Sequence, residues 1–136
     1  MHYTIKLLPV LLLIGLSSGQ TAVQTSVCEL AQQSKKFAQT TVRIRATVQT
    51  DFIEHTMIVD RNCPKIAASL WIPHELDNTK GVEQLRAVLR RQWMDSTSKI
   101  PGVDAEMTGD FIVEGKRRYF RVRSIDSVTP VLTTDR

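Results

Sequence analysis

The chain has little of the material from which most catalytic and metal sites are built. It carries three histidines and two cysteines in 136 residues, and aromatic residues make up only 6%. His55 and His74 do not form an H-x-x-x-H or H-E-x-x-H motif, the cysteines form no C-x-x-C motif, and there is no G-x-S-x-G elbow or phosphate-binding loop. We therefore expect no catalytic residue, no metal site and no cofactor, and we interpret both histidines as solvated loop residues.

Long hydrophobic runs are also missing. The main apolar segment, residues 7–16, is about half of the ~20 residues that a membrane span needs. Lys6 precedes this segment and small residues follow it, which is the order of an export signal. We therefore expect residues 1–19 to be a signal peptide cleaved after Gly19, or alternatively after Ala22. An uncleaved anchor or a buried first helix is the competing interpretation.

The two cysteines, Cys28 and Cys63, both lie in the part of the chain that would be exported. In an oxidising compartment, two cysteines most simply form one disulfide. We therefore expect a Cys28–Cys63 disulfide and a periplasmic or extracellular protein. We expect no membrane span in the mature chain, because no later segment is long and apolar enough.

Hydrophobic periodicity predicts one domain over residues 20–126, with a flexible tail at 127–136 and a disordered polar start at 20–25. The predicted helices cover residues 27–36 and 79–94. The predicted strands cover residues 41–50, 56–59, 66–72, 105–111 and 118–125.

Local signals support these elements. Ser26 and Glu29 match a capping box at the start of the first helix. Gly115 lies in a hairpin turn, and Gly109 suits a sharp coil in a strand. The second helix has an apolar stripe that we expect to face the core, made of Val82, Leu85, Val88, Leu89 and Trp93.

The order of the elements indicates the fold class. Five strands with a helix between the third and fourth is the order of the OB-fold, a small and partly open barrel. We therefore expect a mainly β fold with some α: a five-stranded OB-like barrel with a short N-terminal helix and a longer helix between strands three and four. The alternative is another small α+β sheet with the long helix on one face.

Four short segments carry a resemblance to a known family. They are residues 28–30 (CEL), 41–46 (TVRIRA), 58–63 (IVDRNC) and 107–111 (MTGDF). With these segments the chain resembles small exported bacterial OB-like proteins of unknown function that have two cysteines. In those proteins one cysteine lies near the N-terminal helix and the other follows the second strand. The resemblance covers residues 27–126 and implies no active site.

Two surfaces are candidates for binding. Arg43 and Arg45 project from the first predicted strand and Arg121 and Arg123 from the last, which predicts an anion-binding face for a polyanion or an acidic protein partner. We weigh this against an ordinary charged solvent face, which we favour because strand alternation alone turns polar residues to water. The net charge of +4 permits anion binding without requiring it.

Trp71 and Tyr119 are the two aromatic residues that strand alternation leaves available for a ligand face. Together these features favour an exported, non-enzymatic binding or interaction module. The alternatives are an exported hydrolase of nuclease type, for which Arg43, Arg45, Glu106 and Asp110 could supply charged groups, or a subunit of an oligomeric exported assembly.

Overall fold

The computed structural model describes residues 22–51, 55–95 and 102–130. The predicted signal peptide, residues 1–19, lies outside the described residues. In chain order the elements are β1 (Val23–Thr25), α1 (Val27–Gln32), α2 (Ser34–Phe37), β2 (Thr40–Thr50), β3 (Thr56–Val59), β4 (Ala67–Trp71), a short 3-10 helix (His74–Leu76), α3 (Lys80–Asp95), β5 (Gly102–Glu114) and β6 (Arg117–Pro130).

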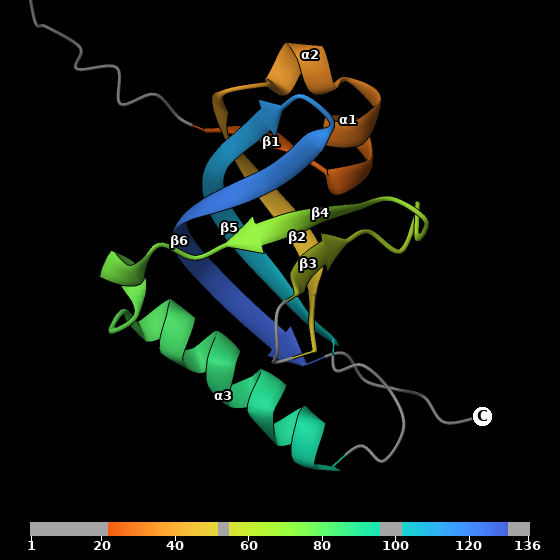
Figure 1. Cartoon of the computed structure of the whole chain (residues 1–136). Coiled ribbons are helices and arrows are strands. Elements are labelled where there is room, and N and C mark those ends of the chain that lie inside the picture. Colours follow the sequence, from red (N-terminus) through yellow and green to blue (C-terminus); the bar gives the residue numbers. More distant parts are fainter. Residues whose placement is uncertain (1–21, 52–54, 96–101, 131–136) are drawn as a thin grey trace, which may run out of the picture.

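Five strands form a closed barrel (Figure 1). β2 pairs with β3, β3 with β4, β4 with β6, β6 with β5, and β5 again with β2. The β4–β6 pair is parallel and the other four pairs are antiparallel. β1 is an additional strand, parallel to β2. The protein is thus mostly β, with a closed five-stranded barrel and few helices, which is consistent with the predicted OB-like barrel.

The inner face of the barrel follows from alternation in the sequence. Every second residue of β2 is buried, as we predicted for Val42, Ile44, Ala46 and Val48. β5 alternates in the same way, and its Gly109 lies beside an irregularity in the pairing with β6. A Cβ atom at Gly109 would collide with the carbonyl oxygen of Arg121 and the ring of Phe120. Glycine therefore lets β5 and β6 approach closely where the barrel coils.

The N-terminal segment differs from our prediction. Residues 23–25, which we expected to be disordered, form β1 and pair with residues 42–44 of β2. The side chain of Val23 is 59% exposed, so this strand is held by main-chain pairing and has no apolar pattern to reveal it.

The Ser26 oxygen caps α1 as predicted, accepting the backbone N–H of Glu29 at 3.1 Å. The Glu29 carboxylate does not complete a capping box; it accepts the Thr25 hydroxyl at 2.7 Å. The expected helix 27–36 is interrupted at Gln33, so α1 and α2 are separate short helices.

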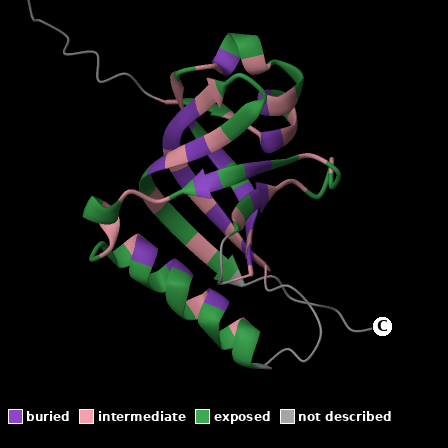
Figure 2. Cartoon of the chain, viewed as in Figure 1, coloured by how far each residue is buried: buried purple, intermediate pink, exposed green. Residues whose placement is uncertain are grey.

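α3 lies against β6 and β5 and buries Val82, Leu85 and Leu89 toward the barrel (Figure 2). Our prediction that Trp93 faces the core is wrong, because Trp93 is 49% exposed. Its neighbour Met94 is 79% exposed. The buried positions end at Leu89. The last turn of α3 therefore adds no buried residue to the described part of the barrel. Trp93 continues the helical spacing of the apolar stripe but is not buried.

β6 is longer than predicted. It pairs with β5 as far as Pro130, so residues 127–130 belong to the barrel and not to the expected tail. A pairing irregularity between Glu106 and Met107 breaks the alternation that a sequence pattern would need. Residues 131–136, the rest of that predicted tail, lie outside the described residues.

Candidate ligand-binding groove

A groove of about 760 Å³ lies on the outside of the barrel between β4 and the β5–β6 hairpin. β3 contributes Met57, and β4 contributes its residues 67–69 and Trp71. The hairpin contributes Glu114, residues 116–118 and Tyr119. The volume is in the range of small-molecule and cofactor pockets in proteins.

The groove lies where β4 and β6 stop pairing. Residues 69–71 of β4 pair with residues 119–121 of β6, and the ladder does not extend to Ala67 or Arg117. Ala67 pairs with β3 on its other side, and Arg117 pairs with β5. The two strands therefore separate toward the hairpin end, and we call this opening the β4–β6 seam.

Aromatic and apolar side chains gather along the outer face of this seam. β4 alternates so that Trp71 faces outward, with 48% of it exposed, and Met57 of the neighbouring β3 is 36% exposed. The rings of Trp71 and Tyr119 have centroids 6.1 Å apart and are tilted by 58°. The Arg121 guanidinium lies 5.7 Å from the Trp71 ring centroid, a cation–π contact that fixes one side of the indole. The structure thus brings together the two aromatic residues that we selected from the sequence.

Cations line the hairpin side of the groove. Lys116, Arg117 and Arg118 are all exposed, and Glu114 is the acidic residue among the groove-lining side chains. The pKa of the Tyr119 hydroxyl is raised, chiefly because it donates a hydrogen bond to the Glu114 carboxylate and further because that charge disfavours the phenolate. Tyr119 therefore keeps its proton and offers a polar group beside the aromatic surface.

Sequence reasoning found part of this groove. It placed Trp71 and Tyr119 on a ligand face, and it noted the cations of the hairpin without assigning them to that face. It missed Met57, because four residues are too few to show which side of a strand faces out. It also missed the seam, since strand separation depends on pairing between distant segments. The alternation of residues 67–71 was the available signal for the outward face of β4.

The predicted anion-binding face lies on β2 and β6 and adjoins the groove at Arg121, which contacts both Trp71 and Asp110. Arg43 pairs with Glu106 at 3.2 Å and with Asp126 at 3.6 Å. Arg45 is exposed and has no ion pair among the described residues. The positive charges of this face are thus interleaved with carboxylates.

Arg121 and Arg123 both bind Asp110, at 3.1 and 3.0 Å. The side chain of Asp110 is only 11% exposed and also accepts the Thr41 hydroxyl at 2.6 Å. Burial alone would raise the pKa of this carboxyl, but hydrogen bonds from Thr41, Arg123 and Arg121 outweigh burial and lower it. Three of the four predicted arginines therefore have acidic partners. This geometry favours a balanced solvent face, and anion binding there stays a prediction.

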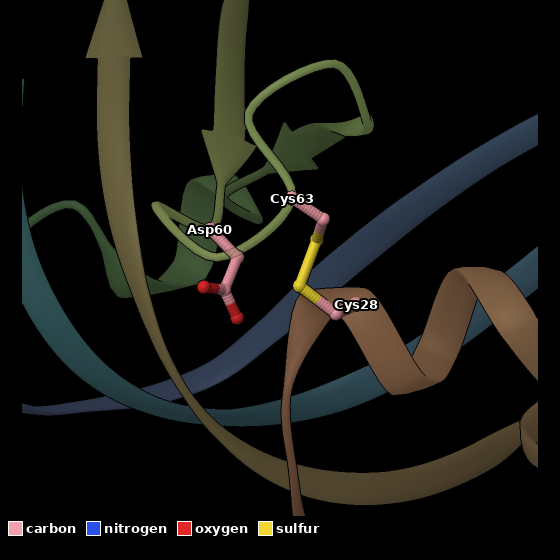
Figure 3. Close-up of side chains that lie close together, drawn as sticks. All are labelled: Cys28, Asp60 and Cys63. Atoms are coloured by element: carbon pink, nitrogen blue, oxygen red, sulfur yellow. A yellow bond between two sulfur atoms is a disulfide. The ribbon is translucent and has the colours of Figure 1, made fainter.

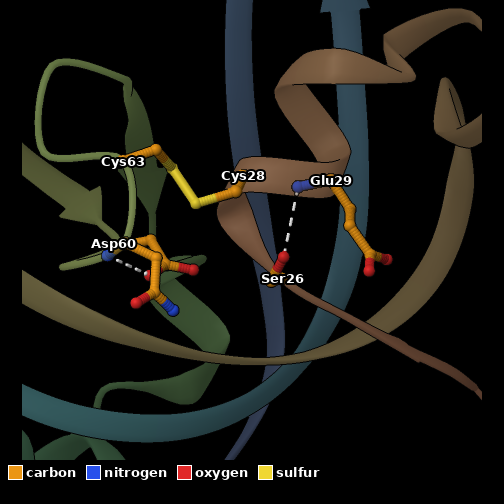
Figure 4. Close-up of a disulfide and its surroundings, with 6 residues drawn as sticks. Ser26, Cys28, Glu29, Asp60 and Cys63 are labelled. Carbon is orange, nitrogen blue, oxygen red and sulfur yellow. Dashed lines mark hydrogen bonds between the residues drawn. A yellow bond between two sulfur atoms is a disulfide. The ribbon is translucent and has the colours of Figure 1, made fainter.

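The disulfide between Cys28 and Cys63 is present, as predicted (Figure 3). It joins α1 to the loop between β3 and β4, with Cα atoms 5.9 Å apart (Figure 4). Asp60 lies beside it and uses a carboxylate oxygen to accept the Asn62 N–H at 2.9 Å. Cys28, Asp60 and Cys63 are close enough to share a metal ion, but both sulfurs are bonded to each other and are no thiolate ligands in this form.

The charged residues behind the nuclease comparison do not form an open acidic cluster. Arg43 is paired with Glu106, and Asp110 is buried under Arg121 and Arg123. Within residues 22–51, 55–95 and 102–130, the group around the disulfide is the one set of three metal-ligating side chains close enough together. No described residue set therefore favours the hydrolase alternative.

The two loop histidines are exposed and each lies beside an aspartate. The Nδ1 atom of His55 is 3.2 Å from Asp51, and His74 contacts Asp77. Asp77 also binds Arg86 at 2.8 Å, and its pKa is lowered, chiefly by that hydrogen bond. His55 therefore has the solvated position outside helices and strands that we predicted, whereas His74 is also exposed but begins the 3-10 helix His74–Leu76.

Comparison with known proteins adds no assignment: no family model, curated protein or solved structure matches this chain. Among the described residues, no helix has the length and apolar character needed to cross a membrane.

Proposed function

We propose that this protein is an exported, non-enzymatic binding module whose ligand occupies the groove along the β4–β6 seam. The single observation that carries the proposal is the groove itself. It combines a half-exposed Trp71 and an exposed Met57 with a row of cations from the hairpin. Pockets that join apolar and aromatic surface to a few polar groups are where proteins most often bind ligands.

The fold supports the position of the site. The strand order β2-β3-β4-β6-β5, closing on β2, together with α3 between β4 and β5, supports an OB-like barrel. OB barrels bind ligands on the face of their second and third strands and on adjoining loops. Here those strands are β3 and β4, and the adjoining loop is the β5–β6 hairpin. We further propose that the chain is related to the small exported two-cysteine proteins that it resembles.

Two features support export. The first is the order of charged, apolar and small residues over residues 1–19. The second is the Cys28–Cys63 disulfide, because such bonds persist in oxidising compartments.

A ligand screen by thermal shift tests the proposal. We would compare the mature wild-type protein with Trp71→Ala and use Trp93→Ala as the matched control, since both tryptophans are half-exposed and only Trp71 lines the groove. A ligand at a hundred times its Kd stabilises a protein by about 2.7 kcal/mol. We expect hits that stabilise the wild type and Trp93→Ala and lose most of that effect in Trp71→Ala. Hits that stabilise Trp71→Ala equally would place the binding site elsewhere.

A further inference from the structure

The main chain along the β4–β6 seam has free edges. The β4–β6 ladder ends at Ser69 and Tyr119, so Ala67 has a partner in β3 and none in β6. Arg117 closes the hairpin with Glu114 and uses its N–H and C=O toward β5, and the next residue, Arg118, turns its N–H away from β5 and toward the seam. A strand edge of this kind presents N–H and C=O groups that can pair with an added strand. Extended peptides bind many proteins in this way, with main-chain hydrogen bonds supplying affinity and side-chain pockets supplying specificity.

The charge of the groove selects among such peptides. Lys116 and Arg117 are exposed and have no ion pair among the described residues, whereas Arg43, Arg121 and Arg123 each have an acidic partner. An acidic segment would meet complementary charge at the hairpin, and among the groove-lining side chains Glu114 is the one that would repel it.

The aromatic side of the groove fits a peptide better than a nucleic-acid strand. Binding of single strands depends on several aromatic faces on which successive bases can stack. Here Trp71 is the one large half-exposed ring in the groove; Arg121 lies against it and Tyr119 is tilted toward it at 58°. This surface, together with Met57, instead suits apolar side chains that alternate with acidic ones along an extended peptide.

On this basis we propose that the groove binds an extended acidic segment of a partner protein, held by main-chain hydrogen bonds to the free edges of β4 and β6. The inference rests on the proposed function, because it names the ligand class of the same groove.

Selection from a random peptide library on the mature, oxidised protein tests the inference. We expect enriched peptides in which Asp or Glu alternates with apolar residues. Their binding can be followed by the fluorescence of Trp71 in a Trp93→Phe background, which leaves Trp71 as the single tryptophan. We expect Lys116→Glu/Arg117→Glu to raise the Kd about tenfold or more at low salt. Arg90→Glu/Arg91→Glu on α3 makes the same change in net charge away from the groove, and we expect it to leave the Kd within about twofold.

Main-chain pairing is tested separately by N-methylation of a selected peptide. Methylating either set of alternate amides should weaken binding at least tenfold, because successive amides of a strand point to opposite sides and here one set faces β4 and the other β6. Amide exchange at Ala67 and Arg118 should slow when the unmodified peptide binds. Unchanged binding of both methylated peptides would overturn strand addition.

A single-stranded oligodeoxythymidine probe separates failure of this inference from failure of the proposed function. If no peptide binds but the oligonucleotide does, and Trp71→Ala removes that binding, the groove is a ligand site and the peptide inference is wrong. If neither probe binds and the thermal-shift screen yields no groove ligand, both proposals are wrong.

Discussion

At the scale of single residues, Asp110 joins three strands of the barrel. Its carboxylate lies on β5 and accepts hydrogen bonds from Thr41 of β2 and from Arg121 and Arg123 of β6. All three donors lie far from Asp110 in sequence or on the other side of a hairpin, so no local pattern reveals them. Strand alternation predicts Arg121 and Arg123 as exposed cations, and in the structure both pair with Asp110.

Asp110→Asn should weaken the fold and flatten its response to acid. The pKa of Asp110 is lowered from 3.8, so its contribution is complete above about pH 4 and is lost as pH falls through the folded-state value. We expect the variant to lose about 1–3 kcal/mol of unfolding free energy at pH 7 and less at pH 2–3. Urea unfolding over this pH range measures the effect.

Glu83→Gln is the control for Asp110→Asn, because it also removes one negative charge and lies exposed on α3. It should change the unfolding free energy by less than about 0.5 kcal/mol. If Asp110→Asn matches this control at every pH, the ion-pair network does not stabilise the barrel.

At the scale of elements, α1 depends on its tertiary contacts. Six residues are too few for an isolated helix to be stable in water. Val27 and Leu30 are buried against the barrel, and Cys28 between them is bonded to Cys63 in the β3–β4 loop. The disulfide therefore fixes both the N-terminal helix and the loop that leads into β4, the strand that carries Trp71.

Cys28→Ser/Cys63→Ser should reduce the unfolding free energy by about 3–4 kcal/mol, because the bond closes a loop with a sequence separation of 35 residues. Equilibrium unfolding in urea measures this loss. The wild type in a phosphine reductant should unfold at the same denaturant concentration as the double variant. If the oxidised wild type, the reduced wild type and the double variant all have the same unfolding midpoint, the disulfide does not contribute to stability.

The elements also show what a sequence can predict. Regular alternation located β2, β4 and more than half of β5 and β6, because each of these strands has one buried face. β3 was also predicted, although its four residues are too few to show which side faces out. Alternation failed for β1, whose three residues are exposed or half-buried, and for residues 127–130 of β6, which follow a pairing irregularity. Trp93 was placed in the core because helical spacing does not tell where the neighbouring sheet ends.

At the scale of the whole molecule, the distribution of charge matters more than its sum. The net charge of +4 says little about partners. Two groups of cations differ in their pairing: Arg43, Arg121 and Arg123 are paired with acids across β2, β5 and β6, whereas Lys116 and Arg117 of the hairpin have no ion pair among the described residues. Strand alternation made the first group the more visible candidate in the sequence, because alternation shows which residues face outward and does not show which acids lie opposite them on other strands. The second group is the one that lies beside a groove.

The intact mass of the exported protein tests the expectations for the whole chain. When the full chain is expressed in a bacterium, we expect it in the periplasm or medium with an N-terminus at Gln20 or Val23. Either cleavage leaves β1 whole, because that strand begins at Val23. The mass should also be about two daltons below that of the reduced chain, since forming the disulfide removes two hydrogens. A protein that retains residues 1–19 would show that the signal prediction is wrong. A mass that does not change on reduction would show that the secreted protein has no Cys28–Cys63 disulfide.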